Sequence, residues 1–153
     1  MWTTRLVACI GLSLLSACAT EKAATVESKT FNVPLVKDCP AAGPNATGVA
    51  TVVVAADGSS VTATVTYSGL SGDPTASHIH FGPSGVAGPV VLPFSPPLAS
   101  PFSKTFTAAD YVAAAGAPPD FTAFVVALRA GGAAYVNVHT AACKPGEIRG
   151  EIQ

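Results

Sequence analysis

Two neighbouring β-rich runs limit most strongly what this chain can fold into. They extend from Gly48 to Ala55 and from Val61 to Ser68, with Asp57-Gly58 between them, and in the second run apolar residues alternate with Thr or Ser. A period of two is typical of a strand with one buried face, and Asp-Gly between two such runs is a strong hairpin signal. We therefore expect a β-hairpin with one face buried and the other exposed to water.

Six further segments also have the composition of strands. Each is short and bounded by Gly, Pro or Ser: Thr30–Val36, Ala76–Phe81, Pro89–Phe94, Phe102–Phe106, Tyr135–Thr140 and Glu147–Ile152. The length of 153 residues favours a single domain. About eight short strands predict an all-β fold, an antiparallel β-sandwich or barrel.

Two short helices are predicted in the crossover that precedes Tyr135. Thr107 can cap a helix that extends to Ala115. Asp120 can cap a second helix over 121–130, which Gly131-Gly132 would end. We expect these helices to connect strands without forming a layer of the core.

Charge and motif content exclude several classes of function. Eight basic and nine acidic residues leave a formal net charge of −1, so there is no basic surface for phosphates, and nucleic acid is not an expected partner. The sequence lacks a P-loop, a GxGxxG after a strand and a GxSxG. No motif places a nucleophile or a carboxylate pair beside a base, so we do not expect an enzyme.

The N-terminus predicts export and lipidation. Met1–Arg5 carries one positive charge, and the apolar run Leu6–Leu15 has the length of a signal peptide and is too short to span a bilayer. The run ends in Leu15-Ser16-Ala17-Cys18, which resembles the bacterial lipobox. Residues 1–17 are thus predicted to be a lipoprotein signal peptide, with Cys18 acylated. The alternative is an ordinary signal peptide cleaved near Ala17 or Ala19 without lipidation.

An acylated Cys18 would anchor the protein stably in a lipid bilayer of the bacterial cell envelope. The residue after Cys18 is Ala19 and not Asp. This resembles lipoproteins that are sorted to the outer membrane, on its periplasmic or surface side, if the source is Gram-negative. Residues 18–29 are polar, with interspersed Glu and Lys, and are expected to form a flexible tether. The folded domain is expected to span residues 30–153.

Two cysteines remain for the folded domain, because Cys9 would leave with the signal peptide and Cys18 would carry lipid. An isolated pair outside the cytoplasm is most simply a disulfide, which would join Cys39 to Cys143. The alternative is a pair of thiolate metal ligands, although neither cysteine lies in a CxxC motif.

The chemistry of the chain is concentrated in its three histidines. His78 and His80 are two residues apart in a predicted strand, so their side chains share one face, while Ile79 takes the other. The same parity in Tyr135–Thr140 places Tyr135, Asn137 and His139 on the outer face of that strand. We expect all three histidines to face away from the core.

Three imidazoles can bind Cu(II) or Zn(II), provided that His139 lies next to the strand of His78 and His80. If the last strand pairs in a hairpin with Tyr135–Thr140, His139 would lie close to Glu147, and Asn137 close to Arg149. Asn137, Glu147 and Arg149 are thus the groups expected to orient an imidazole, and water or Glu147 would fill a further position on the ion. The alternative is a hydrogen-bonded surface network of the same residues that sets strand pairing and holds no metal.

Four blocks of sequence resemble one known family. Ser77–Pro83, Gly88–Leu92, Tyr135–Thr140 and Pro145–Ile152 occur in the order found in the CHRD domain, named for chordin, and the resemblance covers residues 30–153. It implies an all-β extracytoplasmic module, as in chordin and in many bacterial secreted proteins. The chain departs from the bacterial pattern by extra residues before Tyr135, including 117–130, and by Cys143 in the hairpin loop.

The sequence therefore leaves two alternative hypotheses about function. The first is a non-enzymatic envelope lipoprotein that binds copper or zinc through His78, His80 and His139. The second, suggested by the resemblance to chordin, is an adhesive or scaffold module that binds a partner protein or glycan without metal. The HxH pattern is also similar to copper/zinc superoxide dismutase, but the chain has only three histidines, too few for the bridging ligand and the zinc site of that enzyme.

Overall fold

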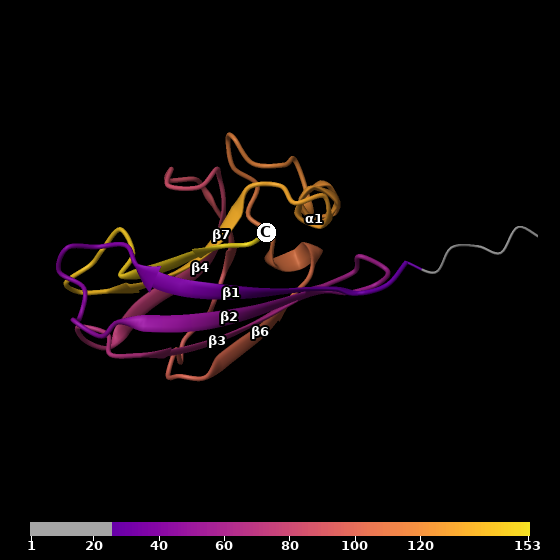
Figure 1. The fold of residues 1–153 in the computed structure, drawn as a ribbon. Coiled ribbons are helices and arrows are strands. Elements are labelled where there is room, and N and C mark those ends of the chain that lie inside the picture. The colour runs from indigo at the N-terminus through magenta and orange to yellow at the C-terminus, as the bar shows by residue number, and fades with distance from the viewer. Residues whose placement is uncertain (1–25) are drawn as a thin grey trace, which may run out of the picture.

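Eight antiparallel strands form the framework of the protein (Figure 1). The computed structural model describes residues 26–153. The strands are hydrogen-bonded in the order β5-β4-β7-β8-β1-β2-β3-β6, which confirms the predicted all-β sandwich or barrel. Their bounds are β1 Lys29–Lys37, β2 Thr47–Val54, β3 Val61–Ser68, β4 Pro74–Phe81, β5 Val90–Pro93, β6 Phe102–Phe106, β7 Ala134–Thr140 and β8 Ile148–Glu151.

Strand β1 joins the two halves of the fold. Its residues 29–35 pair with β2, whereas Val36 and Lys37 pair with β8. In Figure 1, β1, β2, β3 and β6 follow one another as one layer. The two ends of the sheet approach each other through side chains: Phe94, just after β5, packs with ring centroids 5.0 Å from those of Phe102 and Phe106 in β6. The result is a nearly closed barrel.

The β2–β3 hairpin confirms the predicted turn and its buried face. Ala50 lies opposite Val65 and Val52 opposite Ala63, and all four side chains are fully buried. Gly58 adopts a φ of +73°, a conformation that glycine reaches without steric cost. Burying each valine contributes roughly 1.5–3 kcal/mol relative to leaving it exposed, so the alternating pattern itself selects this register.

One helix, α1 (Phe121–Arg129), lies in the connection between β6 and β7. Its N-cap is Asp120, whose carboxylate accepts a hydrogen bond of 2.8 Å from the Ala123 N–H, as predicted. The expectation that the helix lies outside the core is wrong. Phe121, Phe124, Val125 and Leu128 recur at helical spacing and are buried in the core cluster, so this stripe closes one end of the barrel.

The other predicted helix, Thr107–Ala115, is also wrong. A 3-10 turn over Ala108–Asp110 is the only helical structure there. The chain is extended at Tyr111, and the next N–H, that of Val112, donates to the carbonyl of Val91 at 2.9 Å. A hydrogen bond to β5 thus replaces the one that would continue the helix.

The predicted signal peptide, Cys18 and most of the predicted tether lie outside the described residues. The folded region begins with β1 at Lys29, one residue before the expected start of the domain. Within residues 26–153, no helix has the length and apolar character needed to cross a membrane.

Candidate metal centre

The three histidines come from two strands that pair with each other. Strand β4 is antiparallel to β7, with His78 opposite Asn137 and Ala76 opposite His139. The condition for a shared site, that these strands lie side by side, is therefore met. Ile79 points to the opposite side of β4 and is fully buried in the core.

The imidazoles converge. One possible ligand atom from each of His78, His80 and His139 lies within 4.8 Å of the others. His78 Nδ1 is 3.0 Å from His139 Nε2. Nitrogens bound to one ion at about 2 Å each lie at most about 4 Å apart, so a small rotation of the side chains brings all three within reach of the same ion.

Backbone carbonyls determine which nitrogen of two of these rings carries a proton. His80 Nδ1 lies 2.8 Å from the carbonyl oxygen of Gly88, and His139 Nδ1 lies 2.8 Å from that of Lys144. Because a carbonyl only accepts hydrogen bonds, each Nδ1 carries the proton and each Nε2 keeps a lone pair. Metal-binding histidines are commonly oriented in this way.

The Nε2 atom of His80 is buried and has no hydrogen-bond partner among the described residues. The lone pair of His139 Nε2 faces His78 Nδ1. These two atoms can share one proton in a hydrogen bond. With His78 protonated on its other nitrogen, they offer two lone pairs to one ion. The cluster thus presents three nitrogen donors, one of which has no alternative partner.

The pKa values of two rings favour the form that binds metals. Burial, followed by the charges of His139 and His80, lowers the pKa of His78 to about 4. Burial also lowers the pKa of His80, and the hydrogen bond to Gly88 opposes this effect only in part. Both imidazoles are therefore neutral at pH 7, and metal binding requires only that the proton of His78 shift from Nδ1 to its other nitrogen.

The histidines face away from the core, as predicted, but their face of the sheet is not open to water. His80, Tyr135 and Asn137 are only 8%, 3% and 2% exposed. The loop between β4 and β5 covers His80 and Tyr135: the Gly88 carbonyl accepts from His80, and the Gly88 N–H donates to the Tyr135 hydroxyl at 3.0 Å. A Cβ on Gly88 would lie 2.0 Å from the Phe81 carbonyl oxygen, so only glycine allows this close approach.

Arg149 lies opposite Asn137 in the β7–β8 hairpin, as predicted, but it does not contact an imidazole directly. Its guanidinium lies 3.4 Å above the ring of Tyr135, and that ring stacks on His80 at 4.6 Å with an angle of 6° between the planes. The same guanidinium donates to the carbonyls of Val86 and Pro83 in the covering loop. Arg149 therefore fixes His80 through Tyr135 and the loop.

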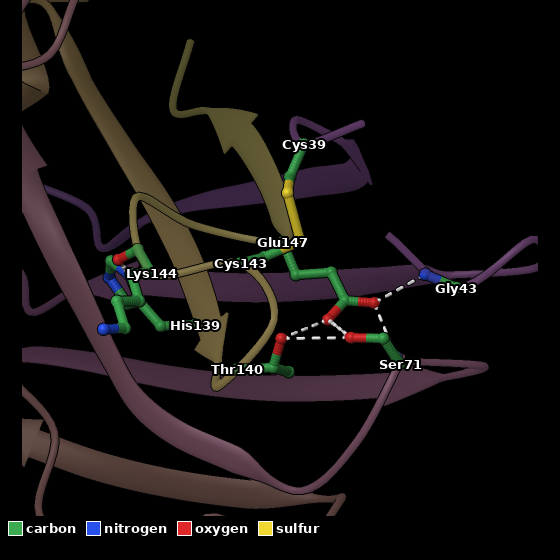
Figure 2. Close-up of a disulfide and its surroundings, with 8 residues drawn as sticks. All are labelled: Cys39, Gly43, Ser71, His139, Thr140, Cys143, Lys144 and Glu147. Atoms are coloured by element: carbon green, nitrogen blue, oxygen red, sulfur yellow. Dashed lines mark hydrogen bonds between the residues drawn. A yellow bond between two sulfur atoms is a disulfide. The ribbon is translucent and has the colours of Figure 1, made fainter. Parts of the chain in front are cut away.

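The carboxylate of Glu147 does not lie beside the His139 ring, so this expectation is wrong. Figure 2 shows its carboxylate directed toward Gly43 and Ser71, away from His139. Strand β8 begins only at Ile148, and Gly146 before it has a φ of +134°, so residue 147 does not follow the alternation of the strand. Glu147 is fully buried and unavailable to an ion at the histidines.

The predicted disulfide between Cys39 and Cys143 is present, so neither sulfur is a thiolate ligand (Figure 2). It joins the loop after β1 to the loop between β7 and β8. The next residue, Lys144, supplies the carbonyl that orients His139. The cross-linked loop thus forms one side of the candidate metal centre.

The residues that sequence reasoning missed act mainly through their backbone. Carbonyls of Gly88 and Lys144 select the tautomers of His80 and His139, and carbonyls have no sequence signature. The one available signal for Gly88 was the glycine-rich loop that follows the HxH strand. Tyr135 was placed on the correct face by its parity, but its stacking on His80 depends on strand register.

Fold and site together define a small all-β domain with a three-histidine cluster on paired strands. A family model described as the CHRD domain matches residues 26–152, and the chain belongs to that family. A search of curated proteins and a search of solved structures gave no match to the chain.

Proposed function

We propose that this protein is a lipid-anchored lipoprotein of the bacterial cell envelope whose CHRD domain binds one copper or zinc ion through His78, His80 and His139. The observation that carries the proposal is the unpartnered Nε2 of His80, a buried lone pair beside two further imidazoles. A hydrogen-bonded network without metal would give every buried nitrogen a hydrogen-bond partner. A bound cation would accept the lone pair of His80 Nε2.

The choice of ion follows from the donors. Imidazole nitrogen suits copper and zinc, and at equal geometry Cu(II) binds more tightly than Zn(II). The role is binding without catalysis, because no nucleophile with an activating base accompanies the cluster in residues 26–153. The proposed localisation in the cell envelope depends on the lipobox-like segment Leu15–Cys18.

Titration of the purified protein with Cu(II) and with Zn(II), followed by measurement of bound metal, tests the proposal. We expect one equivalent per chain. The double change His78→Ala plus His80→Ala should lower the affinity by at least about a hundredfold, because loss of a single orienting group already costs 10–100-fold. Circular dichroism should show a retained fold, since both side chains point away from the core.

A matched control is the pair Thr62→Ala plus Thr64→Ala, which has the same spacing on the outer face of β3. It should bind metal like the unchanged protein. An unchanged protein that binds no ion, or a double-histidine variant that binds as well as the control, would contradict the proposal. The first outcome would favour the adhesive or scaffold role.

A further inference from the structure

A second buried acceptor without a partner lies on the same face as the histidines. Asn137 is 2% exposed, and its Oδ1 accepts no hydrogen bond from the described residues. It lies directly opposite His78 across the β4–β7 pair. Its side chain also lies close to the ring of His80.

The two orphaned atoms cannot satisfy each other. His80 Nδ1 donates to the Gly88 carbonyl, so the neutral ring has a lone pair on Nε2. An amide oxygen is likewise an acceptor only. A single metal ion between His80 Nε2 and Asn137 Oδ1 would accept a lone pair from each of these two buried atoms.

Packing on the other side of Asn137 holds its amide in place. A Cβ on Gly146 would lie 3.2 Å from Asn137 Nδ2, so the turn before β8 lies against the amide nitrogen. Neither Glu147 nor Glu151 competes for the position: Glu147 is bound to Ser71 and Thr140, and Glu151 is paired with Arg149 at 2.9 Å.

We propose that Asn137 Oδ1 is the fourth metal ligand, and that the site is a protein-supplied set of three nitrogens and one oxygen. This inference rests on the proposed function. It assigns Asn137 to the ion itself, where the sequence predicted only a group that orients an imidazole. A site with four protein ligands holds its ion firmly and leaves no position for a substrate, as in structural zinc sites.

The variant Asn137→Cys tests whether position 137 is in the coordination sphere. Co(II) is the probe, because its d–d bands report coordination number and it does not oxidise thiols as Cu(II) does. If residue 137 contacts the ion, the Co(II)-loaded variant gains a thiolate-to-cobalt charge-transfer band in the near ultraviolet. The control Val49→Cys, exposed on β2, gains none. Mass spectrometry confirms that the Cys39–Cys143 bond is intact in both.

Two further variants keep the test decisive if the cysteine variant does not fold. Asn137→Asp, of nearly the same shape, should raise Zn(II) affinity at least about tenfold, since a carboxylate is a stronger ligand than an amide. Asn137→Leu should lower it by about 10–100-fold. Absence of the charge-transfer band, or equal affinity in the Asp and Leu variants, overturns the inference while the three-histidine site stands. Failure of the unchanged protein to bind any ion contradicts the proposed function instead.

Discussion

At the scale of single residues, Glu147 organises the end of the barrel that carries the disulfide. Its Oε1 accepts the N–H groups of Gly43 and Ser71 at 2.8 and 2.7 Å, and its Oε2 accepts the hydroxyls of Ser71 and Thr140, each at 2.5 Å (Figure 2). These partners come from two loops and from β7. A buried carboxylate with four donors replaces the water it lost, and it ties segments that no strand pairing connects.

We predict that Glu147→Gln destabilises the protein by about 2–4 kcal/mol at pH 7, because the neutral amide loses the charge-assisted hydrogen bonds and keeps only one acceptor oxygen for the four donors. Burial raises the pKa of Glu147, but the hydrogen bonds from Ser71, Thr140 and Gly43 outweigh it, so the net pKa is lowered from 4.5. The stabilisation is therefore complete above the pKa of 4.5 that the unfolded chain has, and it is lost as the pH falls through the lower folded value.

Urea unfolding at pH 7 and at pH 3 measures this effect, and the difference between the two proteins should be smaller at pH 3. Glu151→Gln is the control, because its partly exposed ion pair with Arg149 should contribute less than about 1 kcal/mol. Equal stability of the Glu147→Gln variant and the unchanged protein at pH 7 would refute the role assigned to this carboxylate.

At the scale of elements, the loop between β7 and β8 links the disulfide to the candidate metal centre. Cys143 is fully buried and cross-linked, and the carbonyl of the adjacent Lys144 receives the Nδ1–H of His139. Glu147 holds the other end of the same loop. The position of one predicted ligand therefore depends on a covalent bond to the distant loop after β1.

Replacement of both cysteines by serine should lower the free energy of unfolding by about 2–5 kcal/mol, as is usual for a native disulfide that closes a long loop. It should also weaken metal binding by about tenfold, because the Lys144 carbonyl is no longer held against His139. Urea unfolding and a Zn(II) titration give the two values.

A double-mutant cycle separates the two effects. In a His139→Ala background, loss of the disulfide should change metal affinity little further, because the group that it positions is already absent. An additional tenfold loss in that background would show that the disulfide acts on the site by another route.

At the scale of the whole molecule, the domain and its predicted anchor are separate units. The folded region begins at Lys29, so an acyl group at Cys18 would be joined to β1 by only about ten residues. A linker of that length keeps the domain within a few nanometres of the bilayer surface. Within residues 26–153, the histidine face is covered by the loop between β4 and β5, to which Arg149 donates.

We expect Cys18→Ser to release the protein from the membrane fraction, as a soluble or unprocessed form, because the residue that carries the lipid is lost. Fractionation of cells followed by detergent partitioning measures this. Cys9→Ser is a matched control within the predicted signal peptide and should remain membrane-bound. A Cys18→Ser protein that still partitions as a mature lipoprotein would show that the predicted anchor is wrong.

The strands and their inward faces could be predicted from the sequence, whereas the adjacency of β4 and β7 was only a condition for the histidine cluster, and the structure meets it. Side chains alternate every two residues in a strand, so the parity of His78, His80 and His139 follows from their numbers alone. The disulfide followed from counting cysteines. Residue 147 broke the same rule, because Gly146 turns the chain before β8 and parity holds only within a regular strand.

The sequence by itself determined what is periodic: which residues are buried, which share a face, and which fold class they build. Tertiary structure alone decided what lies on top of that face. The loop before β5 covers His80 and Tyr135, and the turn before β8 lies against Asn137. Backbone carbonyls 8 and 5 residues along the chain from His80 and His139 select the tautomers of these two rings. The path of a loop depends on contacts between distant segments, and a carbonyl is the same in every residue, so neither leaves a pattern that a sequence can display.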